Sequence, residues 1–101
     1  MPTTDALIIS AIQTKRLIRF TYGGNPRTCE PHVFGTANGR KQVLCWQEDG
    51  GSSRSGLPEW RRFDLDEIFD LEVIRTEKFP GKRAVPKPHS LGWDSFIAIV
   101  R

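Results

Sequence analysis

Apolar and polar residues at the start of the chain follow the period of a helix. Four apolar residues recur at spacings of one and four positions, which places them on one helical face. They are Leu7, Ile8, Ala11 and Ile12. Thr3 or Thr4 can cap this helix, and Asp5 falls in its first turn, where a carboxylate favours the positive end of the helix dipole. The pattern predicts an amphipathic helix over about residues 5–15 that lies across the core.

The pattern then changes to alternation, which predicts strands joined by turns. Residues 18–22 (IRFTY) place apolar and polar side chains on opposite sides of a strand. Residues 23–26 (GGNP) are strong turn residues, so a hairpin partner is expected from Arg27 to about Phe34. Pro31 lies within this partner and has no N–H to donate, which indicates either an edge strand or a bulge.

The next segments continue the series of strands. Asn38-Gly39 is the commonest short signal for a tight hairpin turn, and residues 41–46 (KQVLCW) are predicted as the following strand. Residues 48–59 (EDGGSSRSGLPE) bury too little apolar surface to offset their ordering entropy, so this stretch is predicted as a mobile loop. Residues 60–65 (WRRFDL) resume the alternation and predict another strand.

The last third of the chain contains two short ordered segments around an irregular one. Asp66 can cap a single turn through Ile68-Phe69, and residues 71–75 (LEVIR) are predicted as a strand. Residues 80–92 hold three prolines and two glycines, which predicts an irregular basic arm. The apolar run over residues 93–100 is too short for its period to decide, and its β-branched residues favour a strand.

One helix followed by four or five short strands predicts a mainly β fold, and a small barrel rather than a parallel α/β sheet. A chain of 101 residues is the size of one domain. We expect residues 1–79 to form the helix and the barrel. We expect residues 80–101, the basic arm and the final apolar segment, to pack on the same domain.

The charged residues are distributed unevenly along the chain. The net charge of +3 is uneven, with +4 over residues 1–62, −4 over residues 63–75 and +3 over residues 76–101. A basic side attracts polyanions, although charge alone is equally consistent with a solvated surface.

No apolar run is long enough to span a membrane and no basic region precedes a secretory core, so we expect a cytoplasmic protein. Cys29 and Cys45 lack C-x-x-C spacing and are expected to be reduced, semi-buried thiols.

The residue pattern offers no self-contained catalytic or metal site. His32 and His89 have no second ligand at metal-binding spacing. Cys29 and His32 could form a nucleophile pair, but residues three apart in a strand point to opposite faces. The densest carboxylate cluster could bind Mg²⁺ or Ca²⁺, but it lacks the spacing and the glycine of an EF-hand loop, which favours a solvated turn. That cluster is Asp64, Asp66, Glu67, Asp70 and Glu72. We therefore expect neither an enzyme nor a cofactor.

Basic residues interleaved with aromatic ones are the remaining candidates for chemistry. An arginine offers a planar fork for phosphate and an exposed ring can stack on a base. The candidate phosphate-binding residues are Arg27, Arg40, Lys41, Arg61 and Arg62. Trp46 and Trp60 are possible stacking rings, although a place in the core is favoured for both and for Phe63. Alternation places Arg61 with Phe63 on one face and Trp60 with Arg62 on the other. The alternative role of the arginines is to cover the rim of the core with their stems.

Three segments, taken in the order in which they occur along the chain, resemble the WYL domain, an Sm-like or SH3-like β-barrel of bacterial regulators. IISAIQTKRLIRFTY is similar to the family's first helix and first strand. Residues 27–31 (RTCEP) are similar to its R-x-V-x-P strand, and residues 61–68 (RRFDLDEI) to its R-x-F-x-L-x-R-I segment. The resemblance covers about residues 7–75. The Trp-Tyr-Leu triplet that names the family falls on Lys41-Gln42-Val43, and the second arginine of the later motif falls on Glu67.

This resemblance implies a non-catalytic regulatory module, often joined to a DNA-binding helix-turn-helix, that senses a ligand or binds nucleic acid or nucleotides. Carried over by motif, Arg27 and Arg61 are the ligand-contacting arginines. The leading hypothesis is a module that binds a phosphate-bearing ligand, single-stranded nucleic acid or a nucleotide, on a basic barrel face. The alternative is a protein-interaction or oligomerisation module. It would dock a regulatory protein or a second copy through the edge strand near Pro31 or the tail at residues 80–101.

Overall fold

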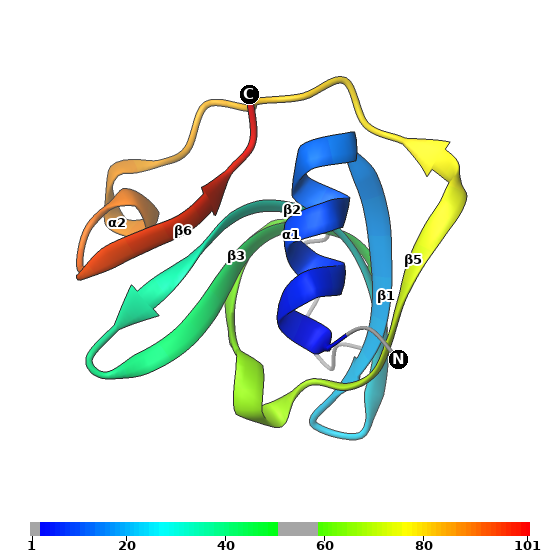
Figure 1. Ribbon diagram of the computed structural model, residues 1–101, viewed down its shortest axis with the longest axis horizontal. Coiled ribbons are helices and arrows are strands. Elements are labelled where there is room, and N and C mark those ends of the chain that lie inside the picture. The colour runs from blue at the N-terminus through cyan, green and yellow to red at the C-terminus, as the bar shows by residue number, and fades with distance from the viewer. Residues whose placement is uncertain (1–2, 51–58) are drawn as a thin grey trace.

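A computed structural model describes residues 3–50 and 59–101 of the chain. The helix α1 spans Thr4–Thr14, within one residue of the prediction at each end (Figure 1). The side chain of Thr3 accepts a hydrogen bond from the N–H of Ala6 and caps the helix. The helix ends at Lys15, whose left-handed backbone (φ 57°) turns the chain into the first strand. The predicted helix is confirmed.

Six strands form one antiparallel sheet, which confirms the prediction of a mainly β fold with one helix at the N-terminus. They are β1 (Arg16–Tyr22), β2 (Asn25–Ala37), β3 (Arg40–Gly50), β4 (Glu59–Asp64), β5 (Phe69–Lys78) and β6 (Ser95–Ile99). The order is β4-β3-β2-β1-β5, and β6 pairs with β2. A single 3-10 turn, η1 (Leu65–Glu67), carries the chain from β4 at one end of this order to β5 at the other. Hairpins join β1 to β2 and β2 to β3 (Figure 1), and β3 pairs antiparallel with β4.

The first two hairpins have two-residue turns. Asn38 and Gly39 connect β2 to β3 with φ of 53° and 75°, as predicted. Gly23 and Gly24 connect β1 to β2 with φ of 59° and 79°. The predicted four-residue turn there is wrong, because Asn25 already pairs with Tyr22 across the hairpin.

Pro31 marks the point where β2 changes its neighbour. Cys29 of β2 pairs with β1, whereas Val33 pairs with Ile99 of β6 on the same side of the strand. The register against β3 shifts between Pro31 and Val33, which confirms the bulge. The alternative of an edge strand is wrong, since β2 lies inside the sheet. A residue without an N–H fits there because a bulge interrupts the hydrogen-bond ladder.

Two other local predictions need correction. The stretch predicted as a loop over residues 48–59 contributes Glu48–Gly50 to β3 and Glu59 to β4, and residues 51–58 lie outside the described residues. Asp66 does not cap the turn after β4. Asp64 occupies the cap position, and no side chain there makes a capping hydrogen bond, because Asp64 instead accepts from Gln42 across the strand pair.

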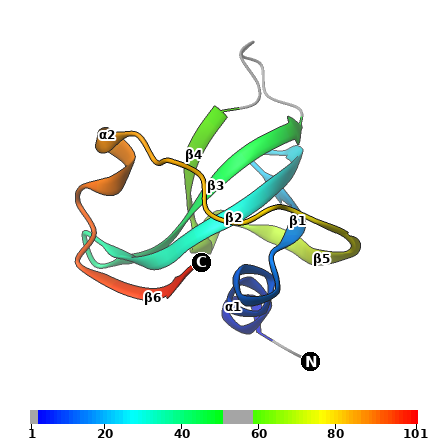
Figure 2. The same cartoon turned by 90° about the horizontal axis from the view of Figure 1, so that it is seen from above.

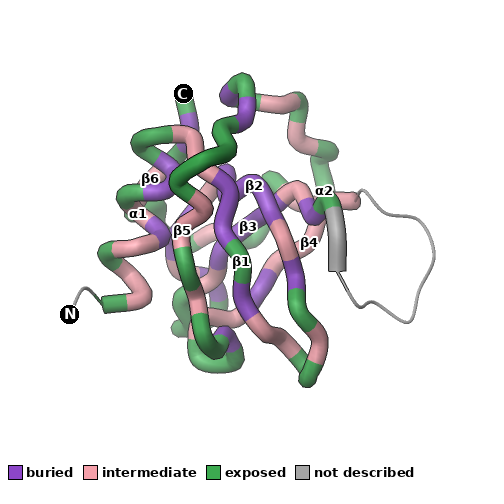
Figure 3. Tube along the Cα trace, turned by 90° about the vertical axis from the view of Figure 1, so that its right-hand side faces the viewer, coloured by how far each residue is buried: buried purple, intermediate pink, exposed green. Residues whose placement is uncertain are grey.

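The core lies between α1 and the face of the sheet that we call the inner face. Three phenylalanines, Phe20, Phe34 and Phe63, are fully buried there with the helix residues Ile8 and Ile12. The middle of β2 is buried along most of its length (Figure 3). Cys29 and Cys45 are free thiols, as expected, but they are fully buried rather than semi-buried, and burial beside Cys29 raises the pKa of Cys45.

The opposite, outer face of β2, β3 and β4 is covered by the chain between β5 and β6. This arm, residues 79–94, is irregular except for the four-residue helix α2 (Lys87–Ser90), which the prediction missed. Figure 2 shows α1 and α2 on opposite sides of β2 and β3. The arm leads into β6, a strand as predicted, which crosses Gly35 so closely that a Cβ there would lie 2.2 Å from the carbonyl oxygen of Ser95.

Candidate functional site

Arg27 and Arg61 lie on the inner face of the sheet, on the two strands that flank β3. Arg27 is in register with the core residue Phe20, and Arg61 with Cys45. Directly opposed residues in an antiparallel pair share a face. Gln47, which is fully buried on the same face of β3, lies between their strands. The register therefore places on one face of the sheet the two arginines to which the family resemblance assigns ligand contact.

Arg27 is a buried cation whose described partners are neutral. The residue is only 7% exposed. Its guanidinium donates to Gln47 Oε1 (3.4 Å) and to the carbonyl oxygen of Tyr22 (3.2 Å), and Nε has no acceptor. The Tyr22 and Phe63 rings lie 5.7 and 5.8 Å from the guanidinium carbon. No carboxylate of the described residues forms an ion pair with Arg27, so its charge is offset only by dipoles and ring faces.

Arg61 is more accessible and is held by an acidic neighbour. Glu59, two residues earlier on the same face of β4, accepts hydrogen bonds from Arg61 Nε (2.8 Å) and NH2 (2.7 Å). The side chain of Arg61 keeps 26% of its surface exposed. We call Arg27, Gln47, Glu59 and Arg61 the arginine cluster. Both of its guanidinium groups are planar forks of the kind that pairs with anions.

Arg62 points to the outer face, as the alternation predicts, and holds the arm in place. Its NH2 donates to the carbonyl oxygen of His89 (2.8 Å) and to that of Leu91. Its guanidinium carbon lies 4.2 Å from the centre of the Trp93 ring. Burial in this contact lowers the pKa of Arg62. The described contacts of Arg62 are thus those of a structural clamp between β4 and the arm.

Arg40 and Lys41 lie at the other end of the β3–β4 pair. Arg40 is five residues along β3 from Cys45, which faces Arg61, a separation of about 17 Å at the usual rise of a strand. Arg40 forms an ion pair with Asp64 (3.7 Å), and Lys41 with Asp5 (2.6 Å). The five predicted basic residues therefore occupy three separate places: the arginine cluster, the clamp under the arm and this distal end.

Trp46 and Trp60 form a half-buried pair on the outer face. They oppose each other across β3 and β4, with ring centres 5.3 Å apart in an edge-to-face arrangement. Arg83 of the arm covers the Trp46 ring at 5.0 Å, and His32 packs on Trp60 at 4.9 Å. Both tryptophans are thus more exposed than the buried Phe63, for which the core prediction is confirmed.

The structure adds a polar cluster that the sequence analysis missed. Glu30 and His32 flank the bulge at Pro31 and both are 1% exposed. Arg83 donates two hydrogen bonds to Glu30, from Nε to Oε1 (2.7 Å) and from NH2 to Oε2 (2.8 Å), and His32 Nε2 lies 3.1 Å from Oε1. We call Glu30, His32, Glu48 and Arg83 the glutamate cluster. The alternation around Pro31 could have placed Glu30 and His32 together, but nothing local pointed to Arg83, 53 residues later.

The two glutamates of this cluster have opposite pKa shifts. Burial alone would raise the pKa of Glu30, but the hydrogen bonds from Arg83, Glu48 and His32 outweigh it and lower the pKa to about 2. The hydrogen bond to Glu30, with burial and the charge of Glu30, raises the pKa of Glu48 to about 7. Burial lowers the pKa of His32 despite the neighbouring carboxylate. Near neutral pH, Glu30 is therefore ionised and Glu48 is partly protonated.

Comparisons of the chain with protein-family models, with curated proteins and with solved structures find no match. Within residues 3–50 and 59–101, no group of three His, Cys, Asp or Glu residues is arranged to hold a metal ion. In the same part of the chain, no helix is long and apolar enough to cross a membrane.

Proposed function

We propose that this domain is a non-catalytic regulatory module that binds a phosphate-bearing ligand, single-stranded nucleic acid or a nucleotide, at the arginine cluster. The observation that carries the proposal is Arg27, a guanidinium that is 7% exposed and has no carboxylate partner among the described residues. Arg61 supplies the second guanidinium on the same face. The proposal places the protein in the cytoplasm, where such ligands are abundant.

A buried cation without an ion pair is costly, because the protein replaces hydration with weaker dipoles. Arg27 has five N–H donors, and the described residues supply acceptors for two of them. A phosphate group at the rim of the cluster would supply charge and acceptors together, and arginine forks match phosphate oxygens in pairs. Ligand binding would then offset the free-energy cost of burying the charge of Arg27 in the free protein.

The arrangement of strands supports a barrel of the Sm-like or SH3-like type, as in the WYL family. The order β4-β3-β2-β1-β5, the helix before β1 and the single turn η1 between β4 and β5 all fit that expectation. The positions that differ from the family have other contacts here. Glu67 accepts a hydrogen bond from the Tyr22 hydroxyl (3.1 Å), and Lys41 pairs with Asp5.

The remaining candidates have subordinate roles in this proposal. A strand of several nucleotides bound at Arg61 would have the length to approach Arg40 and Lys41, about 17 Å away along β3. Their ion pairs are exposed and weak, so they can exchange partners with phosphates. Arg62, Trp46 and Trp60 contribute by fixing the arm and the outer face.

Fluorescence anisotropy with a labelled single-stranded oligonucleotide of about 10 nucleotides, and with a labelled nucleotide, tests the proposal. We expect binding at low ionic strength that weakens steeply with salt. Arg61→Gln should weaken it and reduce the salt slope by about 0.7, the value of one phosphate contact on a single strand. Arg19→Gln is the matched control, because Arg19 is equally charged but pairs with Glu72 on an exposed surface. Salt-independent or absent binding, or equal losses in both variants, would refute the proposal.

A further inference from the structure

A cavity on the outer face of the sheet is lined mainly by apolar side chains. It has a volume of about 330 Å³ and lies between the sheet and the arm. Its main apolar lining comes from three strands and the arm: Val33, Leu44, Phe96 and Ile99 from the strands, and Val85 and Trp93 from the arm. Pockets for small molecules are typically mostly apolar clefts of about 300–1,000 Å³ that contain a few polar groups. The cavity has the size and the lining of such a pocket.

A bulge in β6 turns two of its residues toward this cavity. The ladder to β2 shifts between Phe34 and Gly35, and Ile97 is the residue of β6 that has no partner in that ladder. Phe96 and Ile99 are three positions apart, so a regular strand would place them on opposite faces, but the bulge lets both line the cavity. They are 56% and 47% exposed. The free protein therefore leaves apolar surface uncovered at this cavity, as interaction sites do.

The aromatic wall of the cavity is held in place by several contacts. A Cβ at Gly35 would lie 3.1 Å from Cε3 of Trp93, so this ring lies directly over the backbone of β2. The indole N–H of Trp93 donates to the carbonyl oxygen of His89 (3.2 Å), and the Arg62 guanidinium lies 4.2 Å from the ring centre. The Phe96 ring is 5.9 Å from the Trp93 ring, at an angle of 38°. Aromatic rings attract one another in such offset arrangements, so this wall favours an aromatic ligand.

The polar residues that line the cavity are basic or neutral. They are Lys82, Arg83, His89 and Ser90. None of the described lining residues is acidic. Arg83 already donates two hydrogen bonds to Glu30, whereas Lys82 is exposed and takes part in no ion pair with a described residue. A ligand with a negative charge complements this lining.

We propose that this cavity binds a small aromatic carboxylate of about two fused rings, with the rings against Trp93 and Phe96 and the carboxylate toward Lys82. A cavity of about 150 Å³ holds one benzene ring, so this cavity suits a molecule of roughly twice that size. The rings of the ligand would remove exposed surface of Phe96 and Ile99 from water. The site is independent of the arginine cluster, which lies on the inner face of the sheet.

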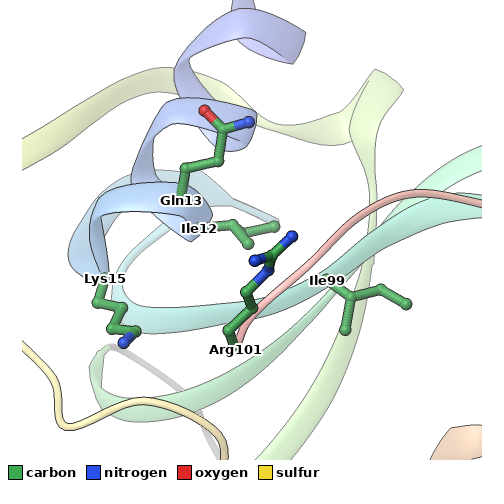
Figure 4. Close-up of a pocket in the computed structure, with 5 residues that line it drawn as sticks. All are labelled: Ile12, Gln13, Lys15, Ile99 and Arg101. Carbon is green, nitrogen blue, oxygen red and sulfur yellow. The ribbon is translucent and has the colours of Figure 1, made fainter.

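A second cavity offers an alternative place for the same ligand. Figure 4 shows it between the last turn of α1 and Arg101, and its volume is about 320 Å³. It is lined by Ile12, Gln13, Lys15, Ile99 and Arg101, so it is also basic, but none of these described residues is aromatic. The aromatic wall favours the cavity on the outer face. Because Ile99 lines both cavities, the test uses residues that line one of them.

Titration with 2-naphthoate, followed by calorimetry and by the indole N–H signals in NMR, tests the proposal. The signal of Trp93 should shift and saturate with the affinity that calorimetry gives. The uncharged 2-naphthylmethanol has the same two rings and should bind about threefold more weakly, as expected for the loss of an exposed ion pair. Lys82→Gln should weaken binding of 2-naphthoate by a similar factor and leave the affinity for 2-naphthylmethanol unchanged.

Variants of β6 test the aromatic wall. Phe96→Ala removes one ring and should weaken binding of 2-naphthoate about tenfold. Ile97→Ala is the matched control, because Ile97 is 42% exposed on the same strand but does not line the cavity, and its affinity should stay the same. Arg101→Gln in the second cavity and Arg61→Gln in the arginine cluster should also leave the affinity unchanged. Circular dichroism confirms that each variant is folded.

Several results would overturn the proposal. They are the absence of 2-naphthoate binding at about 1 mM, equal affinities for the two probes, and a Trp93 signal that stays fixed while other signals move. A loss of affinity in Arg101→Gln or Arg61→Gln in place of Lys82→Gln would place the ligand at another site. Equal losses in Phe96→Ala and Ile97→Ala would likewise contradict the aromatic wall.

Discussion

Replacing Arg83 with methionine should reveal how much of the stability depends on the buried carboxylate of Glu30. Methionine keeps an apolar side chain of similar length but removes both hydrogen bonds to Glu30 and the guanidinium contact with the Trp46 ring. The folded state holds the pKa of Glu30 at about 2, against its ordinary value of 4.5. At 1.36 kcal/mol for each pKa unit, the interactions of this carboxylate contribute about 3 kcal/mol at neutral pH. The larger part depends on Arg83, since it donates two charged hydrogen bonds.

The sign of the pH dependence follows from the lowered pKa. Above pH 4.5 Glu30 is ionised in the folded and unfolded chains, so the contribution is complete. As the pH falls from 4.5 towards about 2, the unfolded chain takes up the proton first and the contribution is lost. In Arg83→Met most of this contribution to stability is already lost at neutral pH. The free energy of unfolding of this variant should therefore change less between pH 4.5 and about 2 than that of the unchanged chain.

Thermal unfolding followed by circular dichroism between pH 2 and pH 7 measures both effects. The melting temperature of Arg83→Met at neutral pH should fall by on the order of 10 °C, from about 4–8 °C for each kcal/mol in a domain of this size. Lys82→Met is the control, because it removes the same charge from the neighbouring, exposed position of the arm. Equal melting temperatures and equal acid dependence in the two variants would refute this role of Arg83.

Two further predictions concern β6 and the glutamate cluster. In Gly35→Ala, the new Cβ meets the carbonyl oxygen of Ser95 at 2.2 Å, so β6 must move, at a cost of about 1–3 kcal/mol. The hydrogen-exchange rates of the β6 amides should therefore rise in this variant. In Gly39→Ala, where the Cβ meets nothing within 4 Å, the exchange rates of these amides should stay the same. The carboxyl carbon signal of Glu48 should titrate near pH 7 by NMR, and a midpoint near 4.5 would contradict the raised pKa. Because this pKa is raised on folding, the contribution of Glu48 to stability is complete below pH 4.5 and is lost as the pH rises through about 7.

Local physical chemistry made much of the fold predictable. The two-residue turn at Asn38-Gly39 and the alternation through β1 depend on neighbouring residues, and both are present in the structure. The missing N–H of Pro31 predicted either an edge strand or a bulge, and the structure contains the bulge. The alternation also placed Arg61 and Arg62 on opposite faces of β4. It could not predict that Arg62 donates hydrogen bonds to carbonyl oxygens of the arm.

The site depends on contacts between distant residues, which local patterns do not contain. Arg83 meets Glu30 across 53 positions, and Arg62 meets Trp93 across 31. The course of the arm decides both contacts, and its prolines and glycines predict only that it is irregular. The family resemblance predicted Arg27 and Arg61 as binding residues. That they lie on one face of the sheet could be known only from the register of β2, β3 and β4.

Binding of a phosphate-bearing ligand at the arginine cluster is reported most directly by the Nε–H signal of Arg27. This N–H has no acceptor in the free protein, so its NMR signal should be sensitive to a nearby anion. Titration with a single-stranded oligonucleotide or a nucleotide at low salt should shift this signal and that of Arg61, with one common affinity. The signal of Arg19, which is paired with Glu72 on an exposed surface, should stay in place. If the signals of Arg27 and Arg61 stay fixed while other residues respond, or if no signal responds, the proposed function is contradicted.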